Sequence, residues 1–500
     1  MIIAHDLGTT GNKASLHEAD GTLLRAVTIG YEPHFAAGGR AEQDPDVWWN
    51  AVVQATQKLL AETGVDPSSV QGLVVGGQMM GAVLLDGNYA PVRPALIWAD
   101  HRSVAQSDEL AGAFDEQEAY AMLGHRINPT YSLSKVMWVR DNEPEVFSRV
   151  RHVCLAKDYV VHRLTGRLAT DHSDASATNA YDQTTGTWSE RMLTAARIDP
   201  ALFPEILKST DVVGPLTSAA AAATGLGTST SVVMGGGDGP VAAVGAGVVS
   251  EDDQAYVYLG SSSWVQIVTA APLIDPLRRT MTFDHVIDGK YVPTATMQAG
   301  GASLQWAVGL FSDRGEKDRF DRLIAEAAGA TASESGLYFL PHLLGERSPY
   351  WNPQAAGAFV GLEMHHGRAN MIRSVLEGVA FNLGTCVNAF NDAGAAISRI
   401  DAIGGGAASD TWLQIMADVW GVTVRRRSIV EEANSLGAAV TASVGLGLVD
   451  DFSVARDLSR VTAEFQPDRE AHERYTAAHQ IFLDAYGQLE PWFPTRRGKH

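Results

Sequence analysis

Cysteine is nearly absent from this sequence, since Cys154 and Cys386 are the two in 500 residues. Two cysteines build neither a disulfide framework nor a cysteine-rich metal site, so the composition predicts a reducing, cytoplasmic environment. Apolar runs such as Val241 to Val249 are far shorter than the roughly 20 residues that span a bilayer. The N-terminus also lacks the basic segment and long apolar core of a signal peptide. We therefore expect no membrane partner.

Positive charge is scarce as well. The sequence has 38 Lys and Arg against 58 Asp and Glu, a formal net charge of −20 at pH 7. Such a chain would not displace the counterions of nucleic acid, so we expect no nucleic-acid partner. The charge favours a small neutral substrate over a polyanionic one, unless the binding site concentrates positive charge locally. The Walker pattern and the protein-kinase motif set are also missing, which argues against those two nucleotide-binding folds.

What the sequence does have is length and alternating α/β patterning. A chain of 500 residues is too long for one hydrophobic core, so two domains of about 250 residues are expected. Asp44 followed by Pro45 predicts the start of a helix that Gly64 ends. Short apolar runs predict strands at residues 2–5, 13–17, 23–28, 71–75, 231–234, 254–259 and 264–268.

Two strand–loop–strand units of similar design lie half the chain apart. The first loop reads Gly8-Thr9-Thr10-Gly11 and the second Gly260-Ser261-Ser262-Ser263, and a third glycine turn follows at Gly404-Gly405-Gly406. Glycines let backbone N–H groups approach a phosphate, and hydroxyls add further donors. A duplicated fold with one such loop in each half would clamp a nucleotide between two domains. The alternative is a pair of ordinary hairpins.

Two carboxylates accompany these loops. Asp6 ends the first strand and would hold Mg²⁺, directly or through water, or else cap the loop that follows. Asp238 is expected at the start of a helix, where the helix dipole favours its ionised form. An ionised carboxylate there would accept the proton of an alcohol that attacks a γ-phosphate, although Asp is also a common N-cap.

Several longer strings resemble the FGGY family of carbohydrate kinases over nearly the whole chain, from Asp6 to about Gly445. The most specific is GAFVGLEMHHGRANMIRSVLE at residues 357–377, which is similar to the family's C-terminal signature. The N-terminal signature is represented by SLSKVMWVRDNEPEVF from Ser132, although Thr130 is atypical at its start. Shorter strings, among them AEQDPDVWW, LGERSPYWNP and IGGGAASDTWLQIMADV, resemble the xylulokinase branch.

The resemblance implies a duplicated actin/hexokinase-like ATPase fold of the ribonuclease H-like type, with two lobes and a central cleft. It places a sugar-binding domain with the first phosphate loop at residues 1–247 and a nucleotide-binding domain at residues 248–490. The implied reaction is ATP-dependent phosphorylation of a primary hydroxyl on a sugar or polyol. Dimers are common in the family, so a homodimer is a candidate assembly.

The resemblance also assigns residues. Asp238 matches the catalytic base, and Asp6 matches the carboxylate associated with phosphate and with Mg²⁺, held through water. Matches to ATP contacts are Gly8, Thr9, Thr10, Gly260, Ser261, Gly301, Gln305, Gly405, Gly406 and Asp410. Candidate contacts to the sugar are Gln78, Met79, Met80, Asp100, Asp238 and Gly239, with Arg102 and Tyr131 as further polar contributors.

Two departures bear on the substrate. Xylulokinases usually have His where this chain has Met80, and Asn where it has Gly239. Since lost hydrogen-bonding groups change which hydroxyls a pocket satisfies, the site should select a differently arranged, shorter or less oxygenated substrate. A pentulose such as xylulose is the first expectation, followed by ribulose, L-xylulose, erythritol or a similar polyol. Trp264 is expected either to pack in the core or to narrow the cleft.

Rival functions remain on this fold. One is an acyl-phosphate kinase or plain ATPase, and another is a non-catalytic, actin-like ATP-binding protein. Three further motifs receive plain structural interpretations, namely His365-His366 as a solvated loop, Arg425-Arg426-Arg427 as a solvated strand edge, and Trp48-Trp49 as helix packing.

Overall fold

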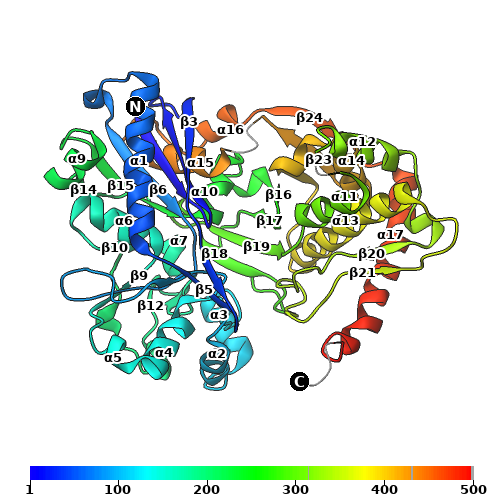
Figure 1. Ribbon diagram of the computed structural model, residues 1–500, viewed down its shortest axis with the longest axis horizontal. Coiled ribbons are helices and arrows are strands. Elements are labelled where there is room, and N and C mark those ends of the chain that lie inside the picture. Colours follow the sequence, from blue (N-terminus) through cyan, green and yellow to red (C-terminus); the bar gives the residue numbers. More distant parts are fainter. Residues whose placement is uncertain (314, 429–431, 497–500) are drawn as a thin grey trace.

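The computed structural model describes residues 1–313, 315–428 and 432–496, and arranges them around two large sheets (Figure 1). The first sheet has the strand order β14-β15-β6-β1-β2-β3. Its strands are β1 (Ile2–Leu7), β2 (Gly11–His17), β3 (Leu23–Gly30), β6 (Gly72–Gly77), β14 (Val212–Pro215) and β15 (Ser231–Gly237). We call this sheet and the elements packed on it the first half of the molecule.

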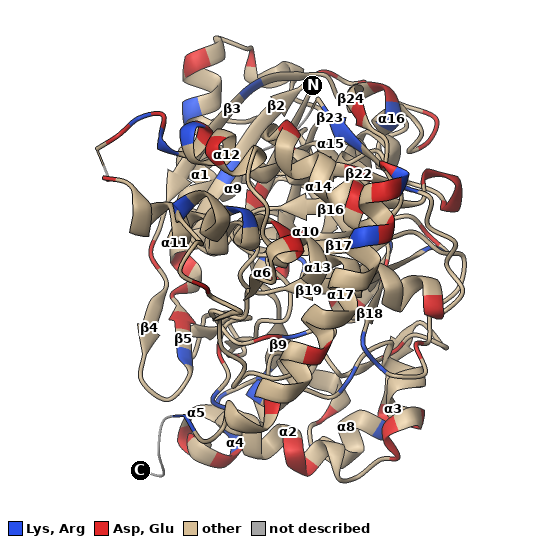
Figure 2. Cartoon of the chain, turned by 90° about the vertical axis from the view of Figure 1, so that its right-hand side faces the viewer, with Lys and Arg blue, Asp and Glu red and all other residues tan. Residues whose placement is uncertain are grey.

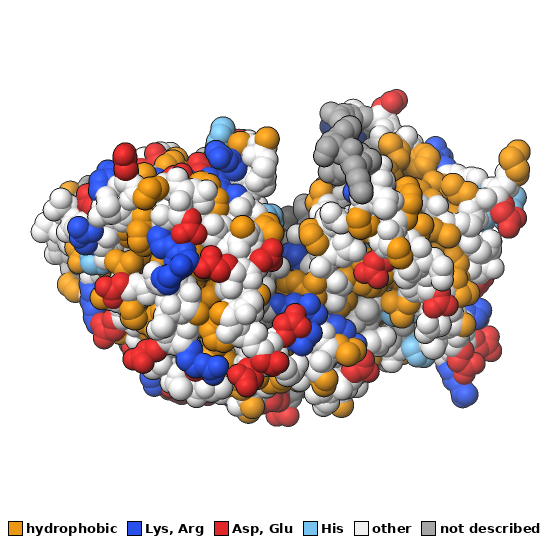
Figure 3. Space-filling view, turned by 90° about the horizontal axis from the view of Figure 1, so that it is seen from below, with side chains coloured by type: hydrophobic (Ala, Val, Ile, Leu, Met, Phe, Trp, Pro, Cys, Tyr) orange, Lys and Arg blue, Asp and Glu red, His pale blue; other side chains and the backbone are white. Residues whose placement is uncertain are grey.

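The second sheet has the order β18-β19-β17-β16-β22-β23-β24. Its strands are β16 (Ala255–Leu259), β17 (Ser263–Ile267), β18 (Met281–Asp284), β19 (Tyr291–Met297), β22 (Arg399–Ile403), β23 (Thr423–Arg427) and β24 (Val461–Phe465). With the helices packed on it, this sheet forms the second half, which lies beside the first in Figure 1. The surface is hollowed between the two halves when it is seen from below (Figure 3).

The two sheets share one pattern of strand pairing. In the first half, β1 forms a hairpin with β2 and pairs in parallel with β6, which pairs in parallel with β15. In the second half, β16 forms a hairpin with β17 and pairs in parallel with β22, which pairs in parallel with β23. The prediction of a duplicated strand–loop–strand design is therefore confirmed at the level of topology.

Helix α1 (Pro45–Thr63) illustrates how local sequence sets an element of the first half. The Asp44 side chain accepts a hydrogen bond from the Asp46 N–H, and Gly64 ends the helix with φ of 66°. Trp48 on this helix is buried in the first core, as predicted, whereas the ring of Trp49 is half-buried beneath the Arg163 guanidinium.

Two helices from distant parts of the sequence pack closely beside the first sheet. They are α10 (Asp238–Gly245) and α15 (Ala433–Gly445), and the Ala438, Ala439 and Ala442 methyls of α15 meet apolar residues of β1 and β6. A Cβ on Gly245 would lie 1.8 Å from the Ala433 oxygen, so glycine is required for this approach. A helix from late in the sequence thus completes the first half, next to the end of β1.

The expectation of a solvated edge at Arg425-Arg426-Arg427 is wrong. These residues lie in β23, which is paired on one side by β22 and on the other by β24. Arg425 and Arg427 both bind the buried Asp401 carboxylate, with nitrogen–oxygen distances of 2.6 and 2.7 Å. A single sequence window could not reveal this, because the partner strand and the partner acid lie elsewhere in the chain.

Charged side chains of both signs are spread over the outer helices. Figure 2 shows acidic residues on α2 (Val104–Ala111) and α3 (Glu116–Leu123), whereas α8 (Glu190–Ala196) carries both an acidic and a basic residue. Within the described ranges, no helix is both long and apolar enough to cross a membrane.

Candidate active site

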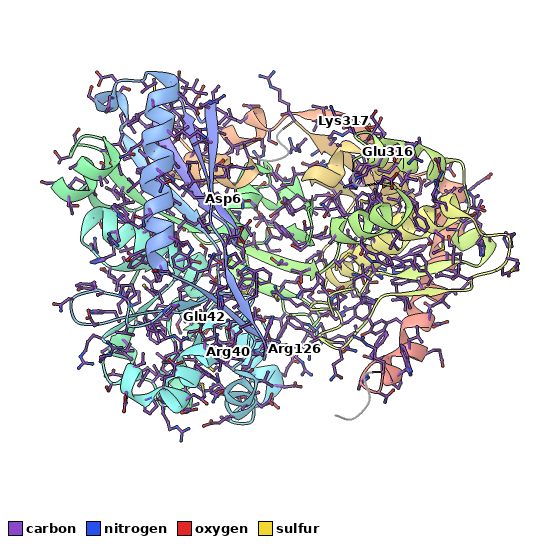
Figure 4. The ribbon with its side chains drawn as sticks, viewed as in Figure 1. Asp6, Arg40, Glu42, Arg126, Glu316 and Lys317 are labelled. Atoms are coloured by element: carbon purple, nitrogen blue, oxygen red, sulfur yellow. The ribbon has the colours of Figure 1, made fainter. Side chains whose placement is uncertain are left out.

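The carboxyl ends of three parallel strands meet at one edge of the first sheet. Asp6 lies near the end of β1, Gln78 follows β6, and Asp238 follows β15 as the first residue of α10. Since β1, β6 and β15 run in the same direction, these residues collect at the edge that faces the second half, where Figure 4 labels Asp6. Topology therefore brings together two carboxylates that are more than 200 positions apart in the sequence.

Both carboxylates have raised pKa values. Burial raises the pKa of Asp238 to about 7, and the nearby negative charge of Asp6 acts in the same direction, against the Gly239 N–H and the Arg347 guanidinium. Burial also raises the pKa of Asp6 to about 6, although a hydrogen bond from Asn434 and the charge of Lys13 oppose it. Two acids that repel each other in this way favour a proton or a cation between them.

The loop between β1 and β2 is held from three sides. The Tyr31 hydroxyl donates to the Gly8 oxygen at 2.7 Å, and the Gln43 amide donates to the Thr9 oxygen at 2.8 Å. The Trp98 indole N–H donates to the Thr9 hydroxyl oxygen at 2.8 Å, so the hydroxyl hydrogen of Thr9 is left to donate outward. Thr10 is exposed at the tip. The loop is thus a fixed hairpin that presents two hydroxyls.

A pocket of about 1600 Å³ lies in the second half, beside the turns that follow β16 and β22. It gathers many of the residues that were matched to ATP contacts, namely Gly260, Ser261, Gly301, Gln305, Gly405, Gly406 and Asp410. Helices α11 (Gly301–Phe311) and α12 (Arg319–Ala328) form another part of its wall, with Leu304, Phe320 and Ile324. Gly8, Thr9 and Thr10 lie outside this lining, although Lys13, just beyond their loop, belongs to it.

Glycines are needed where these turns approach each other. Gly404 has φ of 89°, and a Cβ there would lie 2.8 Å from the Leu259 nitrogen. A Cβ on Gly301 would lie 2.5 Å from the Gly260 oxygen. At Gly405, in contrast, a Cβ would meet no atom within 4 Å, so this backbone faces open space. The turns are thus packed against the protein on one side and open on the other, which leaves room for a ligand to approach their backbone.

A second pocket, of about 750 Å³, lies against Asp238. Among the residues predicted to touch the sugar, it brings together Met79, Met80, Asp238 and Gly239. Apolar side chains form much of its wall, namely Trp98, Trp264, Met281, Phe283 and Met297. Its polar lining includes Gln266, Thr294, Thr296, Gln298 and Arg347.

Other predicted sugar contacts lie outside this lining, and among them the Gln78 amide oxygen and the Tyr131 hydroxyl are buried without a hydrogen-bond partner. The Gln78 amide donates to Gln43 at 2.9 Å, and its own oxygen is buried. Asp100 is buried, binds the Arg102 guanidinium at 2.6 Å and accepts from the Ala41 N–H at 2.7 Å. Tyr131 stacks on His125 at 4.1 Å. Asp100 and Arg102 thus form a buried ion pair, and Asp100 also binds the backbone of β5 (Arg40–Gln43).

Trp264 fulfils both roles that were expected as alternatives. Its ring stacks on Tyr258 at 4.2 Å, and its indole N–H donates to the Tyr256 hydroxyl at 3.0 Å. The same side chain also lines the pocket beside Asp238 and narrows it.

Sequence reasoning missed Arg347, Gln266 and Trp98 as residues of this pocket. Arg347 lies within the LGERSPYWNP string, so the string could have drawn attention to it, but nothing local indicates where its side chain points. Gln266 and Trp98 carry no comparable signal, because their positions depend on how the two halves meet.

Comparison with known families decides what this architecture belongs to. Residues 1–245 match the N-terminal domain of the FGGY family of carbohydrate kinases, and residues 255–446 match its C-terminal domain. The chain belongs to the FGGY family of carbohydrate kinases. The predicted two-lobed, actin/hexokinase-like fold is confirmed with it.

This FGGY kinase has full-length relatives. It is 34% identical over 496 residues to a xylulose kinase of Klebsiella pneumoniae, covering 98% of this chain and 99% of the relative. The crystal structure of xylulose kinase from Rhodospirillum rubrum is 30% identical, with a TM-score of 0.90 and coverage of 98% and 99%. That of gluconate kinase from Lactobacillus acidophilus is 26% identical, with a TM-score of 0.92 and 98% coverage of both chains. As a carbohydrate kinase, the protein phosphorylates a small-molecule sugar with ATP as co-substrate.

Proposed function

We propose that this FGGY kinase phosphorylates a primary hydroxyl of a pentulose such as xylulose. The observation that carries the proposal is the position of Asp238, whose carboxylate lies in the smaller of the two pockets, near the turns that bound the larger one. Full-length similarity to xylulose kinases supports the choice of sugar.

In the proposed reaction, Asp238 is the general base. Its carboxylate accepts the proton of the attacking hydroxyl, the hydroxyl oxygen forms a bond to the γ-phosphorus, and the bond to ADP breaks. A pKa of about 7 suits this role, because a base that titrates near the working pH is both ionised and able to hold a proton.

The larger pocket is the proposed nucleotide site. Adenosine and the phosphates would be held by the backbone of its glycine turns, at Gly260, Gly301, Gly405 and Gly406, and by the Ser261 hydroxyl. Gln305 and Asp410 form part of the wall of the same pocket. The hydroxyls of Thr9 and Thr10 would bind the terminal phosphates from the first half. In this proposal, residues 1–247 bind the sugar and contain the first phosphate loop, and residues 248–490 bind the nucleotide.

The residues present also fit Mg²⁺. Asp6 supplies the hard oxygen ligand that this ion prefers, and a cation beside it would relieve the repulsion between Asp6 and Asp238. We propose that Asp6 holds Mg²⁺ through water. When bound, the ion neutralises charge on the phosphates.

An ADP-release assay over pentuloses, other ketoses, aldoses, aldonates and polyols, with ATP and Mg²⁺ fixed, tests the proposal. We expect the highest kcat/KM for a pentulose and little ADP release without sugar. Full-rate hydrolysis without sugar would instead indicate an ATPase, and no turnover on any acceptor would indicate a non-catalytic ATP-binding protein. Preference for gluconate would place the chain with the gluconate kinases.

A further inference from the structure

The pocket beside Asp238 contains a guanidinium that forms no direct ion pair with a described residue, although the charges of Glu346 and Asp238 act on it from a longer distance. Arg347 lines this pocket, and within the part of the chain that the structure describes its guanidinium forms no ion pair. Its Nη2 lies 3.5 Å from the Met281 sulfur and 3.9 Å from the Met80 sulfur, and its Nε is buried without a hydrogen-bond partner. Thioether sulfur is a weak acceptor, so these contacts leave the N–H donors of the guanidinium poorly satisfied.

The adjacent acid does not supply the missing partner. Both carboxylate oxygens of Glu346 are occupied: one accepts from the backbone N–H groups of Gln298 and Arg347, and the other contacts His342 and accepts from Asn382. Glu346 therefore fixes the backbone of its neighbour, while the guanidinium extends into the pocket.

Two other polar side chains of the pocket, Gln266 and Thr294, are already hydrogen-bonded to protein groups. The Gln266 amide oxygen accepts from the Tyr256 hydroxyl, and its nitrogen donates to the Thr294 hydroxyl at 2.8 Å. Thr294 in turn donates to the Val292 oxygen at 3.0 Å. The hydroxyls of Ser263 and Thr296, which also line the pocket, are buried without a hydrogen-bond partner, as is the Arg347 Nε. Of these groups, the guanidinium is the cation and offers the most N–H donors to a polar ligand.

Leaving a cation unpaired in a pocket with apolar walls is costly, and proteins keep such a group where a ligand completes it. A guanidinium offers several N–H donors in a fixed plane, which suits the oxygen atoms of a sugar.

We propose that Arg347 binds the acceptor sugar directly, donates hydrogen bonds to its oxygen atoms and thereby orients the primary hydroxyl toward Asp238. The inference rests on the proposed function for the reaction, and it adds that the second half of the molecule takes part in holding the sugar. Met80 and Met281 flank the guanidinium and fix its position. Arg347 is accordingly a residue that determines specificity.

A purely electrostatic role is the competing explanation, because the charge of Arg347 also favours the ionised form of Asp238. The two roles differ in what they predict. An electrostatic role changes the pH at which Asp238 ionises and affects every acceptor equally. A binding role changes the recognition of particular sugar oxygens.

The test compares Arg347→Met with the matched control Arg368→Met. Methionine keeps length and suits the sulfur-lined wall, whereas Arg368 is exposed, pairs with Glu326 and lines neither pocket. For the best acceptor of the panel we expect Arg347→Met to lower kcat/KM by roughly 10- to 150-fold, as for one charge-assisted hydrogen bond. The KM for ATP should stay within about threefold of wild type, and the control should resemble wild type.

Analogues of the acceptor that each lack one hydroxyl, or that carry an alcohol in place of the carbonyl, make the test specific. The proposal predicts that the Arg347→Met penalty shrinks to under about threefold for at least one analogue, the one without the contacted oxygen. An equal penalty for every analogue, with a shifted pH profile, would overturn it in favour of the electrostatic role.

Calorimetric titration of the sugar without ATP gives a second readout. The sugar should bind wild type and the Arg368→Met control alike, and Arg347→Met at least tenfold more weakly; equal binding would overturn the inference. Turnover by wild type decides the proposed function separately, since a kinase that does not need Arg347 would still release ADP with sugar present.

Discussion

At the scale of single residues, the site depends on two carboxylates held where they are costly. Asp238 begins α10 and faces Asp6 across the edge of the first sheet, so that burial and mutual repulsion both raise the Asp238 pKa. A carboxylate in such a place lowers stability, which is tolerated when it has a function. Both activity and stability should therefore respond to its removal.

Asp238→Asn should lower kcat by roughly 10² to 10⁴, the usual contribution of a positioned proton acceptor, while ATP still binds. Steady-state kinetics with a separate nucleotide-binding measurement check this. A well-folded variant with near-normal kcat would contradict the assignment of the base.

The same variant should be more heat-stable than wild type at pH 8. In wild type, folding raises the pKa of the Asp238 carboxyl from 3.8 to about 7. As pH rises, this carboxyl therefore ionises first in the unfolded state, and the folded state loses stability until about pH 7. The gain in Tm should thus be largest above pH 7 and shrink toward pH 4. Calorimetric melting across this range checks it, and a gain that grows toward low pH would contradict it.

The dependence of wild-type activity on pH follows from the same carboxylate. Since the base must be ionised, kcat/KM for the sugar should rise with pH to a midpoint near 7 and then level off. The rise should be lost from the residual activity of Asp238→Asn. A wild-type profile that is flat from pH 5 to 8 would argue against Asp238.

At the scale of elements, the hairpin β1–β2 was well predicted and its surroundings were not. Local sequence was sufficient for the strands, the glycine turns and the caps of α1, because each depends on neighbours in the chain. It was not sufficient for Arg347 or for the burial of Arg427, whose partners come from distant elements. The Asp100–Arg102 pair shows the same limit, since its burial depends on packing that the sequence does not display.

The Thr9→Val/Thr10→Val double variant tests whether this hairpin binds phosphate. Valine keeps the β-branched shape but removes both hydroxyls, one of which is already oriented by Trp98. We expect kcat/KM for ATP to fall by more than about tenfold, the value of one lost charge-assisted hydrogen bond. The control Thr28→Val changes a threonine of β3 that lines neither pocket. Wild-type kinetics in the double variant would reduce the loop to a plain turn.

At the scale of the whole molecule, two similar sheets face each other across the proposed site. The proposed sugar pocket takes residues from both halves: Met79, Met80 and Asp238 from the first, and Gln266, Met281 and Arg347 from the second. A site shared in this way is completed when the halves approach each other, and it then excludes water from the reaction. The repeated loops in the sequence predicted two similar halves. They did not predict that residues of both halves would line the pocket beside Asp238.

The central claim is that the chain transfers the γ-phosphate of ATP to a sugar hydroxyl with Asp238 as base. Phosphorus NMR of a reaction with ATP, Mg²⁺ and xylulose measures this directly, with Asp238→Asn as the matched variant. The account predicts a new phosphomonoester signal, coupled to the protons of the terminal carbon, that grows in step with ADP and is nearly lost in the variant. Inorganic phosphate in place of the sugar ester, or an ester formed equally fast by Asp238→Asn, would contradict it.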